Sequence, residues 1–215
     1  MTNDAKQYAP ATQRNREVIL EVLLEVLPKT GTILEIASGT GEHAVFFAPR
    51  LKPRRWLPSD PNPSSRASVA AWMEDTGCDN LDSPIQIDAS MPNWVVETTA
   101  KPQTPVTAMV NINMIHISPW LACLGLMAGA NRILSAGGIL YMYGPYKIDG
   151  QHTAPSNEAF DASLRSSNPE WGIRDLHQVI AAAKAENLNF LKTVQMPANN
   201  LSVIFEKVEG FSEKV

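Results

Sequence analysis

The chain has 215 residues, 44% of them hydrophobic, and a formal net charge of −4. This length fits one α/β domain with enough apolar side chains for a sizeable core. The acidic balance speaks against nucleic acid or an anionic membrane surface as a partner. The two cysteines lie far apart and match no metal-ligand spacing. Together with an N-terminus that lacks a signal pattern, they predict a cytoplasmic protein, which we expect to be a monomer or homodimer.

The spacing of apolar residues along the chain predicts a series of helices and strands. Apolar residues at helical spacing predict a first helix over 12–27, which Pro28 and Gly31 end. Further helices are expected at 42–51, 64–75, 119–134 and 174–185. Short apolar runs predict strands at 32–37, 56–59, 85–88, 106–112, 139–143, 190–196 and 201–207. A basic run, Lys52-Pro-Arg-Arg55, is expected to be a solvated loop.

The order of these elements predicts the fold class. Strands that alternate with helices favour a parallel sheet covered on both faces. Only four residues join the last two strands, so these must pair antiparallel. We therefore expect a Rossmann-like α/β fold with a mainly parallel seven-stranded sheet, an antiparallel last strand and helices on both faces. Residues 1–215 form one domain, with a lid and helix over 1–30 and a substrate-side insertion over 145–172.

A glycine-rich turn follows the first expected strand, in the stretch ILEIASGTGEHAVFFA that begins at Ile33. Such a turn between strand and helix lets a ligand approach the backbone closely. The residues Gly39-Thr-Gly41 are compatible with the pyrophosphate of a dinucleotide or with the amino-acid end of S-adenosylmethionine. Glu35, an acid inside the strand, favours S-adenosylmethionine, although it could also simply hold the loop amides.

Polar residues at the ends of the next strands extend this prediction. Asp60 lies about twenty residues past the glycines, where a carboxylate can accept both ribose hydroxyls of an adenosine. Asp88 could accept the adenine amino group, or could instead cap a helix. Asn111 follows the fourth strand, beside the expected position of the reacting group. The residues expected to hold the cofactor are Arg14, Glu35, Ala37, Ser38, Gly39, Thr40, Gly41, His43, Asp60, Pro61, Asp88, Ala89, Asn111 and Met114.

Two side chains are candidates for catalysis. His116 follows the fourth strand and could act as a base, and Tyr146 follows the fifth strand and could orient or deprotonate an acceptor. Both could equally be core residues. No metal is expected, because the four histidines are scattered and no ligand cluster is visible.

Longer motifs are distributed over nearly the whole chain. They are Pro10-Ala-Thr-Gln-Arg-Asn15, Ile33-Leu-Glu-Ile-Ala-Ser-Gly-Thr-Gly-Glu-His43, Ser59-Asp-Pro61, Asn111-Ile-Asn-Met-Ile-His-Ile-Ser-Pro-Trp120, Gly144-Pro-Tyr146, Asn157-Glu-Ala-Phe-Asp-Ala-Ser-Leu164 and Asn168-Pro-Glu-Trp-Gly-Ile-Arg-Asp175. With these motifs the chain resembles the DUF938 family of methyltransferase-like proteins. The resemblance implies a class I methyltransferase fold with S-adenosylmethionine as ligand, and it implies no particular substrate.

These observations lead to one functional hypothesis and two alternatives. We expect an S-adenosylmethionine-dependent methyltransferase that acts on a small-molecule acceptor and releases S-adenosylhomocysteine, with residues 1–15 and 145–172 closing over the acceptor. A non-catalytic protein that binds S-adenosylmethionine or S-adenosylhomocysteine and acts through a partner is the first alternative. A nicotinamide-dependent oxidoreductase is the second, which Glu35 and the antiparallel last strand disfavour.

Overall fold

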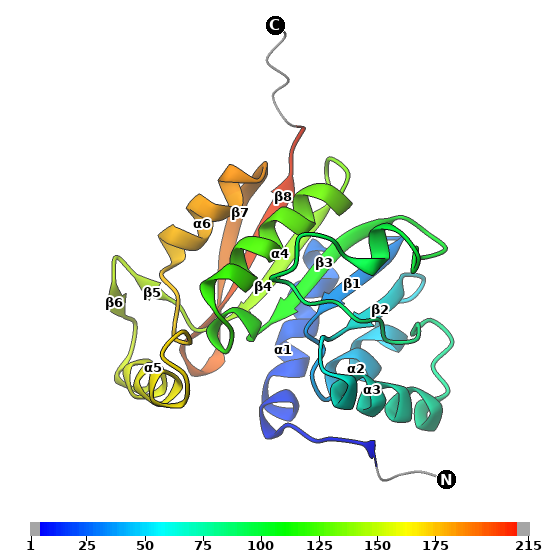
Figure 1. The fold of residues 1–215 in the computed structure, drawn as a ribbon, viewed down its shortest axis with the longest axis horizontal. Helices are drawn as coiled ribbons and strands as arrows, with labels where there is room; N and C mark the ends of the chain where they lie inside the picture. Colours follow the sequence, from blue (N-terminus) through cyan, green and yellow to red (C-terminus); the bar gives the residue numbers. More distant parts are fainter. Residues whose placement is uncertain (1–4, 210–215) are drawn as a thin grey trace, which may run out of the picture.

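A six-stranded sheet forms the centre of the molecule in a computed structural model that describes residues 5–209 (Figure 1). The strand order is β2-β1-β3-β4-β8-β7. The strands are β1 (Thr32–Ile36), β2 (Arg55–Ser59), β3 (Val106–Ile112), β4 (Ile139–Gly144), β7 (Leu188–Met196) and β8 (Asn200–Lys207). Strands β2, β1, β3 and β4 pair in parallel, whereas β8 is antiparallel to both β4 and β7. The predicted mainly parallel α/β sheet with an antiparallel last strand is confirmed.

The predicted count of seven strands is wrong, because residues 85–88 form no strand. Leu81 and Ile85 each make only an isolated parallel bridge to β2, Ile85 through Ser59. The preceding Pro84 has no N–H to donate, and Asp88 accepts hydrogen bonds from Ser90, two residues on, which turns the chain away from the sheet. The segment therefore runs along the edge of β2 without joining it as a strand.

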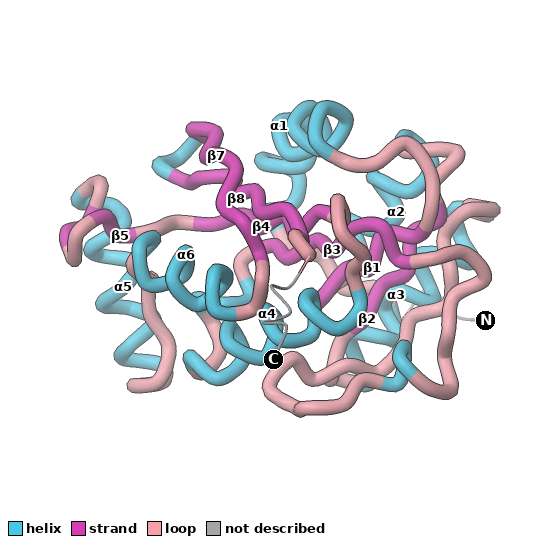
Figure 2. The backbone as a smooth tube through the Cα atoms, turned by 90° about the horizontal axis from the view of Figure 1, so that it is seen from above, coloured by secondary structure: helices cyan, strands magenta, loops and turns pink. Residues whose placement is uncertain are grey.

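Helices cover both faces of the sheet, as expected. Helices α1 (Pro10–Val26) and α2 (Glu42–Arg50) lie on one face, with α3 (Pro63–Thr76) packed against α2. Helices α4 (Trp120–Ile133) and α6 (Leu176–Ala185) lie on the other face (Figure 2). Successive side chains of a strand point to opposite faces of the sheet, so the core has two parts. Ile33 packs in the hydrophobic cluster under α1 and α2, and Leu34 packs in the cluster under α4 and α6.

The segment between β4 and α6 is more ordered than its polar sequence predicts. Strands β5 (Lys147–Ile148) and β6 (Gln151–His152) form a small separate hairpin, and α5 (Pro155–Ser167) follows it. Figure 1 shows this insertion beside the carboxyl end of β4. The helix was missed because only a few of its residues are buried, so its apolar periodicity is weak.

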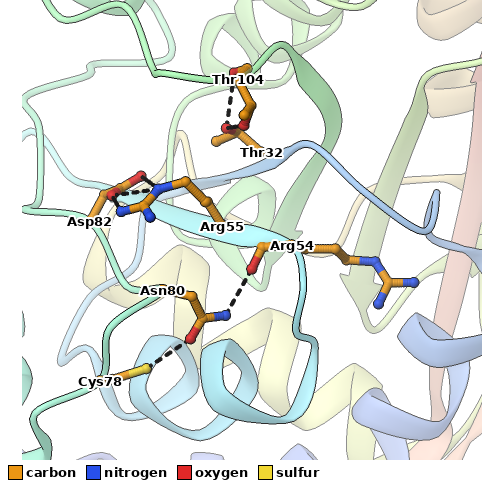
Figure 3. A network of polar contacts seen from close by, with 7 residues as sticks. All are labelled: Thr32, Arg54, Arg55, Cys78, Asn80, Asp82 and Thr104. Atoms are coloured by element: carbon orange, nitrogen blue, oxygen red, sulfur yellow. Dashed lines mark hydrogen bonds and ion pairs between the residues drawn. The ribbon is translucent and has the colours of Figure 1, made fainter.

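A polar network closes the amino-terminal edge of the sheet, and it corrects the expectation for the basic run. Arg54 is only 4% exposed and donates hydrogen bonds to three backbone carbonyls. Arg55 pairs with Asp82, while the Asn80 amide donates to the Arg54 carbonyl (Figure 3). Lys52 is the exposed cation of this run, and its ammonium group pairs with the exposed carboxylate of Asp79 at 2.6 Å. The run is mostly structural, not a solvated loop.

The part of the chain described here, residues 5–209, contains no helix that is both long enough and apolar enough to cross a membrane.

Candidate cofactor site

The turn between β1 and α2 contains two glycines with different roles. Both have positive φ angles, +54° at Gly39 and +87° at Gly41. A Cβ added to Gly41 would lie 2.9 Å from the Val69 backbone, so this glycine lets α2 pack against α3. A Cβ added to Gly39 would meet nothing within 4 Å. The backbone at Gly39 is therefore open to a ligand, and Ala37, at φ +61°, bends the chain toward it.

The end of β2 holds this turn in place. The Asp60 carboxylate accepts hydrogen bonds from the Gly39 amide at 3.0 Å and from the Asn62 amide at 2.9 Å. Two hydrogen bonds join Ser38 and Ser59. The Ser38 amide donates to the Ser59 carbonyl at 2.8 Å, and the Ser59 amide donates to the Ser38 hydroxyl at 3.1 Å. A carboxylate has about four acceptor positions, so Asp60 keeps capacity for further donors such as ribose hydroxyls.

Asn111 lies beside the turn, at the end of β3. Its side chain is fully buried, and its Nδ2 donates to the Ile36 carbonyl at 3.0 Å. Its Oδ1 has no hydrogen-bond partner among the described residues. A buried acceptor left without a donor is uncommon in folded proteins. Met114 follows in the short helix η3 (Met114–His116), where it is 7% exposed.

Glu35 lies beneath the turn, inside β1, and is 2% exposed. Its Oε2 accepts a hydrogen bond from the Trp56 indole at 3.0 Å. Burial raises the pKa of Glu35 to about 7, although hydrogen bonds from Trp56 and Ser38 favour the charged form. The carboxyl group therefore joins β1 to β2 within the core.

Two of the predicted cofactor residues lie on helices α1 and α2. Arg14 is on the exposed side of α1, a helix that begins at Pro10 and already includes it. His43 bonds Asn15 of α1 at 2.8 Å and stacks on Phe47. Burial, with the charge of Arg16, lowers the pKa of His43 to about 4, so this imidazole is neutral near pH 7.

The remaining predicted residues surround the edge of the site. Pro61 is exposed after Asp60, and Asp88 is exposed with its Oδ1 occupied by Ser90. Asp88 thus begins a turn and caps no helix. The carbonyl of Ala89 lies so close to α4 that a Cβ at Gly125 would be 1.9 Å from it. Ala89 is therefore a packing residue in the described structure.

The two catalytic candidates pack against each other below the end of β4. His116 and Tyr146 are each 1% exposed, with ring centroids 5.4 Å apart. Neither imidazole nitrogen nor the phenol oxygen has a hydrogen-bond partner among residues 5–209. Burial, with the charge of Arg174, lowers the pKa of His116 to about 3, and burial raises that of Tyr146 well above its usual value. Both side chains are neutral near pH 7.

A segment that sequence reasoning left unexplained fastens the insertion over His116. The Gly172 amide donates to the His116 carbonyl at 2.9 Å. Arg174 donates to the carbonyls of Ile115 at 2.9 Å and Ser118 at 2.6 Å. Asp175, next in the chain, caps α6 and does not pair with Arg174. The Asn168–Asp175 motif is therefore a clamp between the insertion and η3.

Asp161 is the charged centre of the insertion, and the sequence signalled it only as part of a family motif. It is 5% exposed and contacts Lys147 at 2.9 Å, Arg165 at 3.2 Å and His152 at 3.4 Å. Burial alone would raise the pKa of Asp161, but hydrogen bonds from Lys147, Ile173 and Arg165 hold it below its usual value. One carboxylate thus ties α5 to the β5–β6 hairpin.

The segment before α1 lies against α3 and reaches the glycine turn through two side chains. Residues 1–4 of the predicted lid lie outside the described residues. The Ser68 hydroxyl donates to the Thr40 carbonyl at 2.7 Å and accepts from the Gln7 amide at 2.8 Å. Glu42 accepts from the Thr40 hydroxyl at 3.1 Å and from the amide of Ala9. In this structure the segment supports the turn at Thr40.

Two further features of the structure are relevant to the turn, namely the position of a hollow and the distribution of metal-binding side chains. A hollow of about 590 Å³ lies near the start of β3, between Val96, Thr104 and Arg132, and so at the opposite edge of the sheet. Within residues 5–209 no group of three or more histidine, cysteine or acidic side chains could hold a metal ion.

Several solved structures with a similar fold are titled methyltransferases. The methyltransferase SibL, titled S-adenosylmethionine-dependent, matches with TM-score 0.72 and 14% identity over 93% of this chain and 56% of that one. An O-methyltransferase family protein from Burkholderia thailandensis matches with TM-score 0.75 and 11% identity over 93% of this chain and 57% of that one. The chain thus spans little more than half the length of these two proteins. The YcgJ protein of Bacillus subtilis matches with TM-score 0.68 and 13% identity over 92% of this chain and all of that one.

At these identities the likeness establishes the fold, a Rossmann-like methyltransferase fold. A family model described as "Protein of unknown function (DUF938)" matches residues 6–207. This match includes the glycine turn, the Asp161 centre and the Asn168–Asp175 clamp. The chain therefore belongs to the DUF938 family, as its motifs predicted.

Proposed function

We propose that this protein binds S-adenosylmethionine at the glycine turn and transfers its methyl group to a small-molecule acceptor. The observation that carries the proposal is the open backbone of Gly39, held by Asp60 at the carboxyl edge of a methyltransferase-like sheet. Ligands of open α/β sheets bind at this edge. The unpartnered Oδ1 of Asn111, beside the turn, fits a bound polar group there.

The residues present fit this cofactor. Asp60 would accept the ribose hydroxyls, and the bare backbone of Gly39 would admit the amino-acid end of the molecule. S-adenosylmethionine supplies a methyl group that its sulfonium already activates. The protein then has to align the acceptor and exclude water. The clamped insertion over 145–172 would supply that enclosure.

The titles of the structural neighbours support a class of acceptor. Three of them are titled O-methyltransferases, and one of these was solved with apigenin. These titles support a small organic acceptor with a hydroxyl group as the first to test. A cytoplasmic location and a monomeric or homodimeric state remain predictions from the sequence.

Calorimetric titration with S-adenosylmethionine, S-adenosylhomocysteine and NADH tests the cofactor. We expect the first two to bind and NADH not to bind. Gly39→Leu should abolish binding by filling the open space at the turn. Gly77→Leu is the matched control, because Gly77 has φ +59°, close to the +54° of Gly39, and also has nothing within 4 Å of an added Cβ.

The two variants therefore place leucine at similar positive φ angles but in different places in the fold. Binding of NADH alone would move the protein to the oxidoreductases. Unchanged binding of S-adenosylmethionine by Gly39→Leu would refute the assignment of the turn.

A second candidate, a non-catalytic cofactor-binding protein, is supported by the burial of His116 and Tyr146. Neither is exposed to an acceptor, and both are neutral near pH 7. Many methyl transfers need no base, so this burial is also compatible with catalysis. Incubation of the protein and labelled S-adenosylmethionine with a small-molecule extract separates them: a labelled product shows catalysis, and binding without any product favours the second candidate.

A further inference from the structure

A hollow of about 200 Å³ lies beside α2, outside the proposed cofactor site. Two arginines line it, Arg16 of α1 and Arg50 of α2, and both stack on the ring of Phe46. Their Cζ atoms lie 4.5 Å and 3.9 Å from the ring centroid, so they are at most 8.4 Å apart. Two guanidinium groups therefore lie over one ring and line the same small space.

Neither Arg16 nor Arg50 forms an ion pair within residues 5–209. Arg16 is half-buried and its Nε has no hydrogen-bond partner there, whereas the exposed Arg50 donates to the Phe46 carbonyl at 3.0 Å. One acid, Glu42, lines the same hollow, and its Oε2 accepts from the Thr40 hydroxyl and the Ala9 amide. Two arginines thus face one acid, and the half-buried Arg16 lacks an acceptor at Nε, which is costly, so an anion would stabilise the pair.

We propose that Arg16 and Arg50 form a binding site for a small phosphate-bearing molecule. A guanidinium group presents several N–H donors in a plane and matches an oxyanion with two parallel hydrogen bonds of about 2.7–2.9 Å. Two such groups within 8.4 Å can flank one oxyanion. The size of the hollow restricts the ligand to inorganic phosphate or a small phosphate ester.

The outer wall of the hollow suits an ester with a flat apolar group. Tyr8 and Trp72 meet there edge to face, with ring centroids 5.2 Å apart. Their rings could cover a ring or short chain attached to the phosphate. The site does not depend on the proposed methyl transfer, although Glu42 links its wall to Thr40 of the glycine turn.

Calorimetric titration of the full-length protein with inorganic phosphate and with phenyl phosphate tests the site, against sodium chloride at matched ionic strength. We expect saturable binding of at least one phosphate. Arg16→Gln and Arg50→Gln should each weaken it about tenfold or more, as expected for the loss of a charged hydrogen-bond pair. Arg50 lies exposed at the end of α2, so its replacement should leave the fold intact.

Arg132→Gln is the matched control. Arg132 also stacks on an aromatic ring, 5.7 Å from the Trp94 centroid, but it is paired with Glu97 at 2.9 Å. Its replacement should leave phosphate affinity unchanged. Tighter binding of phenyl phosphate would identify an ester as the ligand, and equal binding would identify the free anion.

Three results would overturn the proposal. They are the absence of saturable binding, an equal heat from sodium chloride, and equal weakening in the Arg132→Gln control. Since S-adenosylmethionine takes no part in these titrations, their failure would leave the proposed function untouched.

Discussion

Replacement of Glu35 by glutamine should change how the stability of the protein depends on pH. The carboxyl pKa is about 7 in the folded protein and 4.5 as its ordinary value, so folding favours the protonated form. Between these values the folded state binds one proton more than the unfolded state, and stability falls as pH rises. A shift of this size corresponds to about 3 kcal/mol, because one pKa unit is about 1.4 kcal/mol.

Urea unfolding of both proteins at pH 5 and pH 8 measures this effect. The free energy of unfolding of the wild type, minus that of Glu35→Gln, should fall by about 2 to 3 kcal/mol between the two pH values. Glutamine can still accept from the Trp56 indole, so the variant keeps the contact and loses the titration. The comparison with the variant is necessary because His116 has the opposite effect. Its pKa is lowered to about 3, so its contribution to the free energy of unfolding rises as pH increases toward 6.5, in both proteins alike.

A difference that does not change with pH would refute this account of Glu35. It would mean that the carboxyl group is solvated or paired with a cation in solution, so that burial does not control its pKa.

Three further substitutions test the surroundings of the site. Ser68→Ala removes the hydroxyl that joins Thr40 to the N-terminal segment, and should raise amide hydrogen exchange across the glycine turn while lowering stability by about 1–3 kcal/mol; unchanged exchange would contradict that support. Gly144→Ala places a Cβ 2.4 Å from the ring of His116 and should lower stability by about 1–3 kcal/mol in thermal or urea unfolding, whereas equal melting would show that the ring can move. Asp161→Asn leaves Lys147 and Arg165 without their acid and should destabilise the insertion by about 3–5 kcal/mol. Proteolysis within 145–172 would detect that loosening, and resistance equal to wild type would argue against a central role.

Local patterns in the sequence were sufficient for the sheet, the helices on both faces and the glycine turn. Strand and helix periods are properties of neighbouring residues, and glycine spacing directly marks where a backbone needs positive φ. The short link before Leu201 likewise determined that the last two strands pair antiparallel. Residues 85–88 were assigned wrongly because a short apolar run does not show whether a neighbour strand pairs along its whole length.

The properties of the candidate site depended on contacts between residues far apart in the chain. Only the packing of Trp56 against Glu35 explains why that acid lies in the core, and only the fold shows that His116 and Tyr146 are enclosed. The different roles of Gly39 and Gly41 came from what surrounds each one, since the sequence treats them alike. The sequence by itself predicted most of the main sheet, the helices that cover it and the glycine turn at which we propose that a ligand binds. The tertiary structure decided which side chains are buried, charged or open, because burial and pairing are set by neighbours that the sequence does not place together.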